Sequence, residues 1–510
     1  MYKKLFFFFF FIPHLLPAQI LPKENSKLNY RLIGFSFPLV PEVKKYKIEI
    51  AAGNYTSADS FEKHIIKTEV CSSNKKIIEV PAFGKAYTWR VVFKGITANN
   101  DLHHFSTMSS PVADTSLTRL RILKKAKKYK DAYVFVDGNN TLYDMTGNPV
   151  WFTHIEGFDS NLSLRDLKLS PAGTITCLSG GRPVEINYNG TLLWKAPDNG
   201  VVSGDSAEHY HHEFTRFANG HYMILGSEAA LCQLPDSTDT NMHILNFDRK
   251  KLESNPAAYK KIDLGTIIEY DKKGKVVWSW KSSQYFIGSD VENYRSPGTV
   301  DKYNIEVHEN GFYFDEKNNA VYISFKFLNR IVKIKYPEGN VLHTYGEIYK
   351  PGVPEKGNAL FSGQHSCLRS QSGLLIVYNN NSCNPGAVSE IVALQEPVSE
   401  KDSLKRIWVY KCAIEHSSDV MKYSWQVGGN IIELPDQSLL ACMGGTYGEV
   451  FILGRDKKIL WSALPEQWNK TENKWTPGGG GYRASIIIDR KAMEALIWGG
   501  GPLPAAPGER

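Results

Sequence analysis

Long apolar runs are missing from this sequence beyond its first eighteen residues, so we expect no membrane-spanning helix in the rest of the chain. Dense blocks of lysine and arginine are missing too, and the formal net charge is only +7 over 510 residues. The densest basic cluster, residues 124–130, has the composition of a solvated connector, so nucleic acid is not expected as a partner. The glycine runs at 478–481 and 499–501 lack a phosphate-loop context, and we expect no cofactor.

Cysteine is scarce and irregularly spaced. The seven cysteines include no C-x-x-C pair of the kind that binds metal. Cys367 and Cys383 are the closest pair in the sequence, but the odd total leaves at least one thiol unpaired in a monomer. We therefore expect most of these side chains to be buried thiols that pack as small apolar groups.

The first residues have the composition of a secretory signal. A basic start at residues 1–4 is followed by an apolar stretch at residues 5–12, and Ala18 offers a small residue for cleavage before Gln19. The apolar stretch is too short for a stable membrane span. We expect residues 1–18 to be removed and the mature protein to be exported, to the periplasm or out of the cell, without membrane insertion. No cysteine follows the expected cut, which disfavours a lipid anchor.

Two regions of different pattern follow. Residues 19–108 contain short alternating runs, such as Tyr46–Ile50 and Ala86–Phe93, which predict a small β-sandwich. The order of these motifs resembles that of fibronectin type III-like domains. Residues 109–130, which include a Ser-Ser-Pro breaker, are expected to be a linker, and residues 131–510 the second domain.

One hairpin motif recurs along the second region. The form Tyr-x3-Gly-x3-Trp occurs at residues 143–151 and 270–278. Partial or weaker copies end at Trp194, His343, Trp408 and Trp461. Each copy predicts a strand, a polar turn with glycine at the positive-φ position, and a returning strand whose tryptophan packs inward. Six such hairpins, each preceded by a strand pair, predict an all-β six-bladed β-propeller, with residues 485–488 closing the ring and a long insertion near residues 231–261.

Three histidines occupy one phase of this repeat. His212, His308 and His365 each stand eight residues before the turn of a predicted innermost hairpin, and the same count gives Arg165 and Gly429 in two other blades. Innermost strands line the channel of a propeller, so we expect the three imidazoles and the arginine to meet at one mouth. Such a cationic pocket suits an oxyanion.

Two other interpretations of the histidines stay open. A lone strand histidine is usually a half-buried structural residue, and His211 is expected to be one because alternation turns it away from His212. Three imidazoles could also hold zinc with an open coordination position. No carboxylate that would support the ligands can be assigned from the sequence, so metal ranks second.

These motifs resemble the bacterial arylsulfate sulfotransferase family, exported six-bladed propellers that move sulfuryl groups between phenols. The resemblance runs from about residue 131 to residue 461. Its most specific parts are His-His-Glu-x4-Ala-Asn-Gly at residues 211–220, His-Glu-Asn at 308–310 with the strand pair that follows, and Gln-His at 364–365. The family's sulfated histidine falls on His365, its two other histidines fall on His212 and His308, and its arginine aligns with Lys326.

The resemblance implies a ping-pong reaction. His365 would attack the sulfur of an aryl sulfate, the phenolate would leave, and a phenol would take the group from the sulfohistidine. His212, His308 and Lys326 would stabilise charge, and Arg165 and Tyr378 would contact the substrate. No nucleotide sulfate donor is implied, and the family resemblance is compatible with a homodimer. The alternatives are a non-catalytic propeller that binds a sulfated or anionic ligand, and a metal-dependent hydrolase or lyase on the same scaffold.

Overall fold

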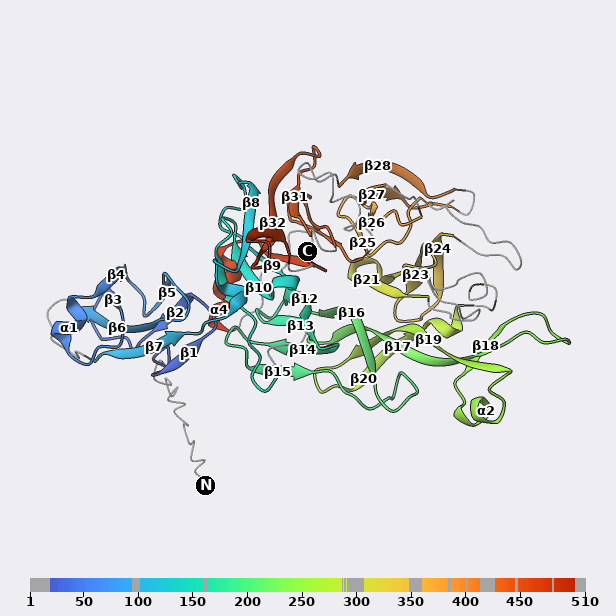
Figure 1. Cartoon of the computed structure of the whole chain (residues 1–510), viewed down its shortest axis with the longest axis horizontal. Helices are drawn as coiled ribbons and strands as arrows, with labels where there is room; N and C mark the ends of the chain where they lie inside the picture. Colours follow the sequence, from blue (N-terminus) through green and yellow to red (C-terminus); the bar gives the residue numbers. More distant parts are fainter. Residues whose placement is uncertain are drawn as a thin grey trace, which may run out of the picture. The chain divides into compact units, whose positions relative to one another are not determined.

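The computed structural model divides the chain into two compact units, Met1–Ser109 and Ser110–Arg510 (Figure 1). It describes residues 19–93, 101–158, 164–286, 288, 290, 307–347, 360–383, 387–399, 402–412, 427–444, 448–478 and 481–499. The expected signal peptide, residues 1–18, lies outside these ranges. Within them, no helix has the length and apolar character needed to cross a membrane.

The first unit consists of two facing sheets. The larger sheet has the order β1 (Ser26–Leu28), β7 (His103–Thr107), β6 (Ala86–Phe93), β3 (Tyr46–Ala52) and β4 (Ile65–Cys71). The smaller sheet pairs β2 (Leu32–Ser36) with β5 (Lys75–Glu79), and a short helix, α1 (Ala58–Glu62), follows β3. Phe35 of the small sheet meets Trp89 of the large one edge-on, with ring centroids 4.9 Å apart and both side chains fully buried. This is a β-sandwich core, while the fibronectin type III likeness stays a prediction.

The strands described in the second unit form six antiparallel sheets. The first has the order β34 (Ala484–Ile487), β9 (Tyr133–Val136), β10 (Thr141–Asp144), β11 (Pro149–Phe152). The second is β12 (Leu164–Leu169), β13 (Ile175–Ser179), β14 (Arg182–Ile186), β15 (Leu192–Lys195). The third is β16 (His209–Arg216), β17 (Tyr222–Gln233), β19 (Tyr259–Tyr270), β20 (Val276–Lys281), with β18 (His243–Asn246) added to β17.

The remaining sheets follow the same plan. The fourth is β21 (Glu309–Asp315), β22 (Ala320–Phe325), β23 (Arg330–Lys335), β24 (Val341–Gly346). The fifth is β25 (Ser366–Arg369), β26 (Leu375–Asn379), β27 (Glu390–Gln395), β28 (Lys405–Lys411). The sixth is β29 (Asn430–Glu433), β30 (Leu439–Cys442), β31 (Val450–Leu453), β32 (Ile459–Asn469), β33 (Lys474–Pro477), with β8 (Thr118–Lys124) also on β32. Among the described residues of this unit, the α-helices α2 (Arg249–Ser254) and α4 (Arg490–Trp498) lie outside the sheets.

The sheets are arranged as a closed ring. Their inner strands contact one another in the order β34, β12, β16, β21, β25 and β29, and β30 returns to contact β34 (Figure 1). The ring closes because the last strand of the chain, β34, pairs with β9 of the first sheet, so that Ala484 opposes Val136. The predicted all-β propeller is therefore confirmed, and the inner strands line its centre.

The repeated tryptophans bind each sheet to the next. Trp151 on an outer strand is fully buried and donates its indole N–H to the carbonyl of Tyr188 in the second sheet, at 2.8 Å. Trp461 of the sixth sheet donates in the same way to Met145 of the first sheet, at 3.1 Å. Burying a large ring and satisfying its one polar atom at the same time explains why the motif ends in tryptophan.

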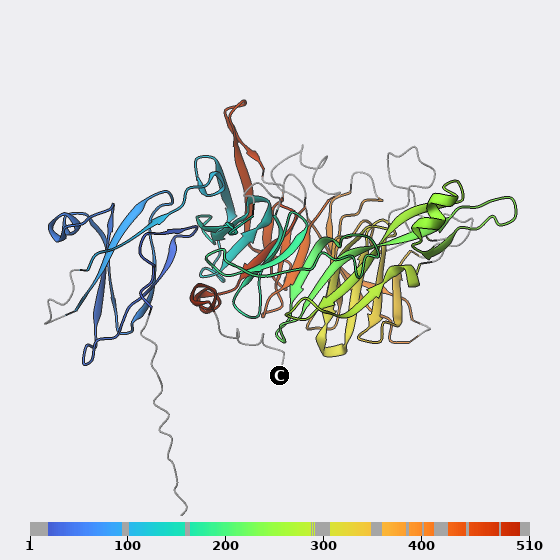
Figure 2. The same cartoon turned by 90° about the horizontal axis from the view of Figure 1, so that it is seen from below.

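The expected linker is partly wrong. Residues 109–130 contain β8, which pairs antiparallel with β32 and so belongs to the sixth sheet. Arg119 and Arg121 of β8 both bond the carboxylate of Glu466 on β32, at 2.6 and 2.7 Å. The outer edge of the sheet offered unpaired backbone groups that this segment could satisfy, a long-range pairing that leaves no local pattern. Figure 2 shows the β32–β33 hairpin projecting beyond the sheets.

The insertion predicted near residues 231–261 is a long ribbon. It is made by β17 and β19, and it carries β18 and α2 (Figure 1).

The cysteines follow the expectation: all seven are free thiols and only Cys383 is exposed.

Candidate active site

Left-handed backbone positions mark the start of several inner strands. Asp166, His212 and His308 have φ angles of 58°, 58° and 51°. The strand pairing shifts its register around Asp166 and His212 and directly after His308, which is the mark of a β-bulge. A non-glycine residue in this conformation costs about 1–3 kcal/mol and persists where the surroundings fix it. The bulges turn side chains of these strands away from simple alternation.

The three predicted histidines lie on consecutive sheets. His212 is on β16, His308 directly precedes β21, and His365 directly precedes β25. The rings of His212 and His308 meet edge-on with centroids 5.0 Å apart. The ring of Tyr482 lies 5.8 Å from that of His212 and 6.1 Å from that of His365, which links them across the centre of the ring of sheets.

The hydrogen bonds of His365 fix its tautomer. Its Nδ1 lies 2.8 Å from Asn380 Oδ1 and 3.1 Å from the carbonyl of Gly363. The Asn380 amide is itself oriented, because its Nδ2 donates to the carbonyl of Gly428 at 3.0 Å. Both partners of Nδ1 are acceptors, so Nδ1 carries the proton and Nε2 carries the lone pair. Nε2 is buried and has no hydrogen-bond partner among the described residues.

His365 is also held neutral. Burial, followed by the positive charge of Lys326, lowers the pKa of His365 well below its usual range, against the opposing effect of the bond to Asn380. The Lys326 ammonium stands over the ring of Phe327, 5.0 Å from its centroid. The backbone of Lys326 is fixed by a bond from its N–H to the carbonyl of His308, at 2.9 Å. A buried, neutral imidazole with a bare nitrogen is a nucleophile or a base.

The residue before His365 locks it in place. Gln364 is fully buried, and its amide Nε2 lies 3.1 Å from Ser324 Oγ and from the carbonyl oxygens of Phe325 and Arg330, which share its two N–H groups. These bonds reach across to the neighbouring sheet. The Gln-His pair of the sequence therefore has a physical meaning, since the glutamine clamps the strand start that presents the histidine.

His211 does not turn away from His212 as expected. Its Nδ1 lies 2.9 Å from the Nδ1 of His212, and its Nε2 lies 3.2 Å from the carbonyl of Gly226. The prediction was wrong because strict alternation ends at the bulge, where His212 is left-handed. Burial, then His211 and then His308, lowers the pKa of His212 well below its usual range.

The two predicted substrate contacts differ. Arg165 is exposed, and its guanidinium stands 4.8 Å from the centroid of the Tyr482 ring, so it belongs to the cluster. Tyr378 does not, because its side chain is fully buried in the apolar core between two sheets, where an added Cβ on Gly429 would meet its ring at 2.1 Å. Side chains alternate between the two faces of β26, and this alternation directs the Tyr378 ring into the core between the sheets. Tyr378 serves the site through its backbone carbonyl, which accepts the N–H of His365 at 3.2 Å.

Tyr482 and Arg483 are the site residues that the sequence did not indicate. The hydroxyl of Tyr482 is buried and has no hydrogen-bond partner within the ranges that the structure describes, and burial raises its pKa to about 12, so the phenol stays protonated. The guanidinium of Arg483 is buried and lies 3.1 Å from Glu213 and 3.5 Å from Asp166. The sequence contained one indication of them. The pair directly precedes β34, the strand that closes the ring, as His308 directly precedes β21 and His365 directly precedes β25.

A buried ionic network supports this pair. Asp166 accepts a hydrogen bond from the N–H of Phe214 at 2.9 Å and forms an ion pair with Lys168 at 2.9 Å. Burial alone would raise the pKa of Glu213, but Arg483 and Lys168 hold it below its usual value. Burial alone would lower the pKa of Arg483, but Glu213 and Asp166 raise it. The charges beneath the histidines are therefore compensated within the protein.

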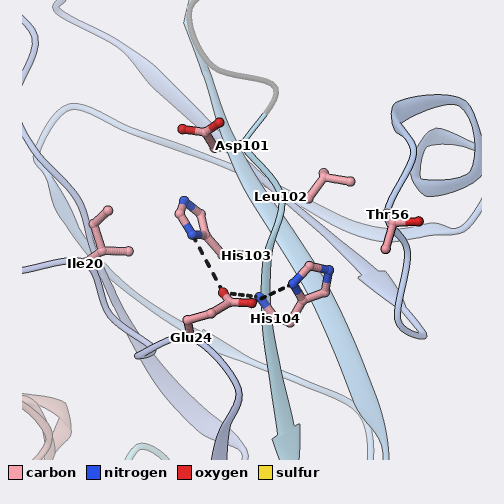
Figure 3. A pocket seen from close by; sticks show the side chains of 7 residues that line it. All are labelled: Ile20, Glu24, Thr56, Asp101, Leu102, His103 and His104. Atoms are coloured by element: carbon pink, nitrogen blue, oxygen red, sulfur yellow. Dashed lines mark hydrogen bonds and ion pairs between the residues drawn. The ribbon is translucent and has the colours of Figure 1, made fainter.

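In the part of the chain that the structure describes, no group of three histidine, cysteine or acidic side chains is placed to hold a metal ion. The first unit has a surface pocket of about 630 Å³ near Glu24, His103 and His104 (Figure 3). There His104 Nδ1 bonds Glu24 at 2.8 Å and its Nε2 bonds the carbonyl of Tyr55 at 2.9 Å. Both nitrogens of this imidazole are occupied, so it offers no free base.

A family model described as Arylsulfotransferase (ASST) matches residues 111–412, more than half of the chain. A search of curated proteins gives no match. Among solved structures, a protein of unknown function from Bacteroides caccae is 12% identical with a TM-score of 0.37, covering 65% of this chain and 92% of that one. A streptogramin B lyase is 12% identical with a TM-score of 0.34, covering 72% and 98%.

The Cps50 (Swd1) β-propeller domain of Myceliophteria thermophila is 8% identical with a TM-score of 0.32, covering 67% of this chain and 88% of that one. TM-scores this low support no argument on function. The assignment of the propeller fold rests on the closed ring of sheets in this protein. The matched range contains all three clustered histidines and Lys326, while Tyr482 and Arg483 lie beyond its end.

Proposed function

This chain belongs to the arylsulfotransferase family, and from that premise we propose that it carries a sulfuryl group from an aryl sulfate to a phenol through a sulfohistidine at His365. The family supports aryl sulfotransferase activity in general. The proposal adds the intermediate, the acceptor class and export, for which the amino-terminal residues 1–18 are the motivation. The enzyme would act in the periplasm or outside the cell, where no nucleotide sulfate donor is needed.

One observation carries the proposal: the bare Nε2 of His365. Two acceptors hold the proton on Nδ1, so that Nε2 presents a lone pair to which no described residue bonds, in a buried site next to His308, His212 and Lys326. An unpartnered buried nitrogen costs free energy, and a catalytic role explains why that cost is tolerated here. The low pKa of His365 keeps this nitrogen unprotonated at neutral pH.

The reaction balances in two steps. In the first, His365 Nε2 donates its electron pair to sulfur, the S–N bond forms, and the aryl oxygen leaves as phenolate with the S–O bonding pair. In the second, the oxygen of an acceptor phenol forms a new S–O bond, the S–N pair returns to Nε2, and His212 takes the phenol's proton. Nδ1–H stays bonded to Asn380 throughout, which stabilises the positive charge on the sulfated ring.

The side chains around His365 suit the negative charge on the oxygens of the sulfuryl group and of the phenolate. The Lys326 ammonium and the Arg165 guanidinium provide positive charge for the sulfuryl oxygens, with lysine as a point charge where the family has an arginine fork. Tyr482 keeps its proton and can donate to an oxygen of the sulfuryl group or of the phenolate. Positioning and charge stabilisation therefore supply most of the catalysis, as they do in phosphoryl transfer.

The test uses the full chain with p-nitrophenyl sulfate, with and without phenol. We expect acceptor-dependent release of p-nitrophenolate, lost by at least about 1000-fold in His365→Ala, the effect of removing a nucleophile. His343→Ala, an exposed histidine on β24, is the matched control and should retain full activity. Donor alone should add the mass of one SO₃ to the wild-type protein and not to His365→Ala.

Three outcomes contradict parts of this proposal. Activity that survives His365→Ala would remove His365 as the nucleophile. Absence of release with every aryl sulfate tried would favour a non-catalytic propeller that binds an anionic ligand. Activity abolished by a chelator would favour the metal-dependent alternative.

A further inference from the structure

His211 makes contacts that the reaction above does not use. It sits beside His212 on β16 at the bulge, and the two Nδ1 atoms are 2.9 Å apart. The other nitrogen of His211, Nε2, lies 3.2 Å from the carbonyl oxygen of Gly226 on β17. The imidazole thus joins the sheet backbone to the ring of a clustered histidine.

The carbonyl oxygen of Gly226 determines which nitrogens of His211 and His212 carry protons. A carbonyl oxygen only accepts, so the Nε2 of His211 must be the donor in the contact with Gly226. A neutral His211 then has a bare Nδ1, and the 2.9 Å contact requires that the Nδ1 of His212 be the donor. The Nε2 of His212 is left with a lone pair on the side of its ring opposite His211.

We propose that His211 is a positioning residue that holds His212 as the Nδ1–H tautomer, so that Nε2 of His212 is the base for the acceptor phenol. The inference rests on the proposed sulfuryl transfer and assigns its proton path. As the phenol oxygen bonds to sulfur and the S–N pair returns to His365, the phenol's proton passes to Nε2 of His212. The next phenolate product, or water, then takes that proton. The same logic governs the orienting carboxylate of a serine protease triad, with an imidazole in its place.

The charged and titratable groups around His212 come from four sheets. They are His211 on the same strand, His308, His365 and Arg483, and the ring of Tyr482 packs against it. Burial lowers the pKa of His212 most, and the interactions with His211, His308, Arg483 and His365 lower it further. Among the described residues around it, His211 is the one that hydrogen-bonds to the His212 ring, and that bond determines which His212 nitrogen carries the proton.

The experiment separates the two half-reactions in rapid mixing. p-Nitrophenyl sulfate alone gives the burst of p-nitrophenolate that reports sulfation of His365, a step that needs no base because p-nitrophenolate leaves as an anion. Discharge is then followed with two acceptors at one mildly alkaline pH that lies between their pKa values: unsubstituted phenol, which is still protonated and must lose its proton, and p-cyanophenol, which is largely ionised. The variants are His211→Leu, His211→Asn and the control His243→Leu, an exposed histidine on β18.

We expect His211→Leu to keep the burst, to slow discharge to phenol by about 100-fold, and to change discharge to p-cyanophenol little, since a positioned base contributes about 10²–10⁴-fold. His211→Asn should recover most of the lost rate, because its Oδ1 can take the place of Nδ1 and accept the proton of His212. Rates are normalised to burst amplitude, which counts correctly folded sites in every variant.

Each other outcome overturns the inference in its own way. Equal losses with both acceptors and in the burst would make His211 structural. Unchanged discharge to phenol in His211→Leu would mean that another group orients His212. A wild-type protein without any burst would instead refute the proposed function.

Discussion

The buried guanidinium of Arg483 should be essential to the stability of the second unit. It is 3% exposed, and it pairs with Glu213 at 3.1 Å and Asp166 at 3.5 Å while donating to the carbonyl of Asn310 at 3.0 Å. In Arg483→Met, a chain of similar length loses the charge, and Lys168 alone remains against two buried carboxylates. Removing one partner of a buried ion pair costs about 3–5 kcal/mol, because a charge is left uncompensated.

The pH dependence of that cost tests its cause. In the wild type the pKa of Glu213 lies below its usual value of 4.5, so this carboxylate contributes stability above pH 4.5 that is lost as the pH falls through its folded-state pKa. In Arg483→Met the pKa of Glu213 should rise instead, because burial is no longer opposed by Arg483. The difference in unfolding free energy should therefore be largest at neutral pH and shrink towards pH 4.

Urea unfolding of the full chain at pH 7, 5.5 and 4 measures this. Arg490→Met is the matched control, since Arg490 is largely exposed and pairs with Glu494 at 3.2 Å on the surface of α4. That substitution should cost less than about 0.5 kcal/mol at every pH. A cost for Arg483→Met below about 1 kcal/mol, or one that does not change with pH, would refute the network as a compensated set of charges.

Three further predictions concern single side chains. Asn380→Leu removes the 2.8 Å bond to His365 and should lower kcat/KM for p-nitrophenyl sulfate by about 10-fold, the worth of one buried hydrogen bond; an unchanged rate would show that Gly363 alone sets the tautomer. Burial and then Glu228 raise the pKa of Glu309 well above 4.5, so wild-type stability should fall as the pH rises from 4.5 to the folded-state pKa. Glu309→Gln should flatten that dependence in denaturant unfolding measured from pH 4.5 upward. In the first unit, Glu24→Gln should lower the unfolding free energy by less than about 1 kcal/mol, and most between about pH 4.5 and 6.5. In that range Glu24 is ionised and His104, whose pKa is raised, is protonated, and the stabilisation from the pair is lost as the pH rises through the folded-state pKa of His104. A constant cost in thermal unfolding from about pH 4 to 8 would argue against this pair.

The hairpins show how far local pattern reached. Glycine at the turn and tryptophan on the returning strand identified the outer hairpins, because the turn needs a positive φ and the indole needs a buried acceptor within its own neighbourhood. The phase of His212, His308 and His365 relative to the turns was visible for the same reason, since each histidine is tied to its own strand by a fixed number of residues.

The missed residues show where local pattern stops. Tyr482 and Arg483 precede β34, which is followed by α4 rather than by a hairpin, so no turn marked its phase. In a closed ring the last strand of the chain becomes the inner strand of the first sheet, and only that closure brings the pair to the centre. The family model ends at residue 412 and does not reach them.

The sequence by itself therefore determined the sheet-forming hairpins, the ring that they build and the common phase of the three histidines, because each depends on spacing within one repeat. The choice of His365 as the nucleophile came from the family resemblance and stays a proposal. Tertiary structure alone decided which way the side chains point. The bulge at His212 turned His211 toward it, packing between sheets took Tyr378 into the core, and the sixth sheet recruited β8 to its edge. These outcomes depend on contacts between residues far apart in the chain, where the free energy of packing and pairing overrides the alternation that a single strand shows.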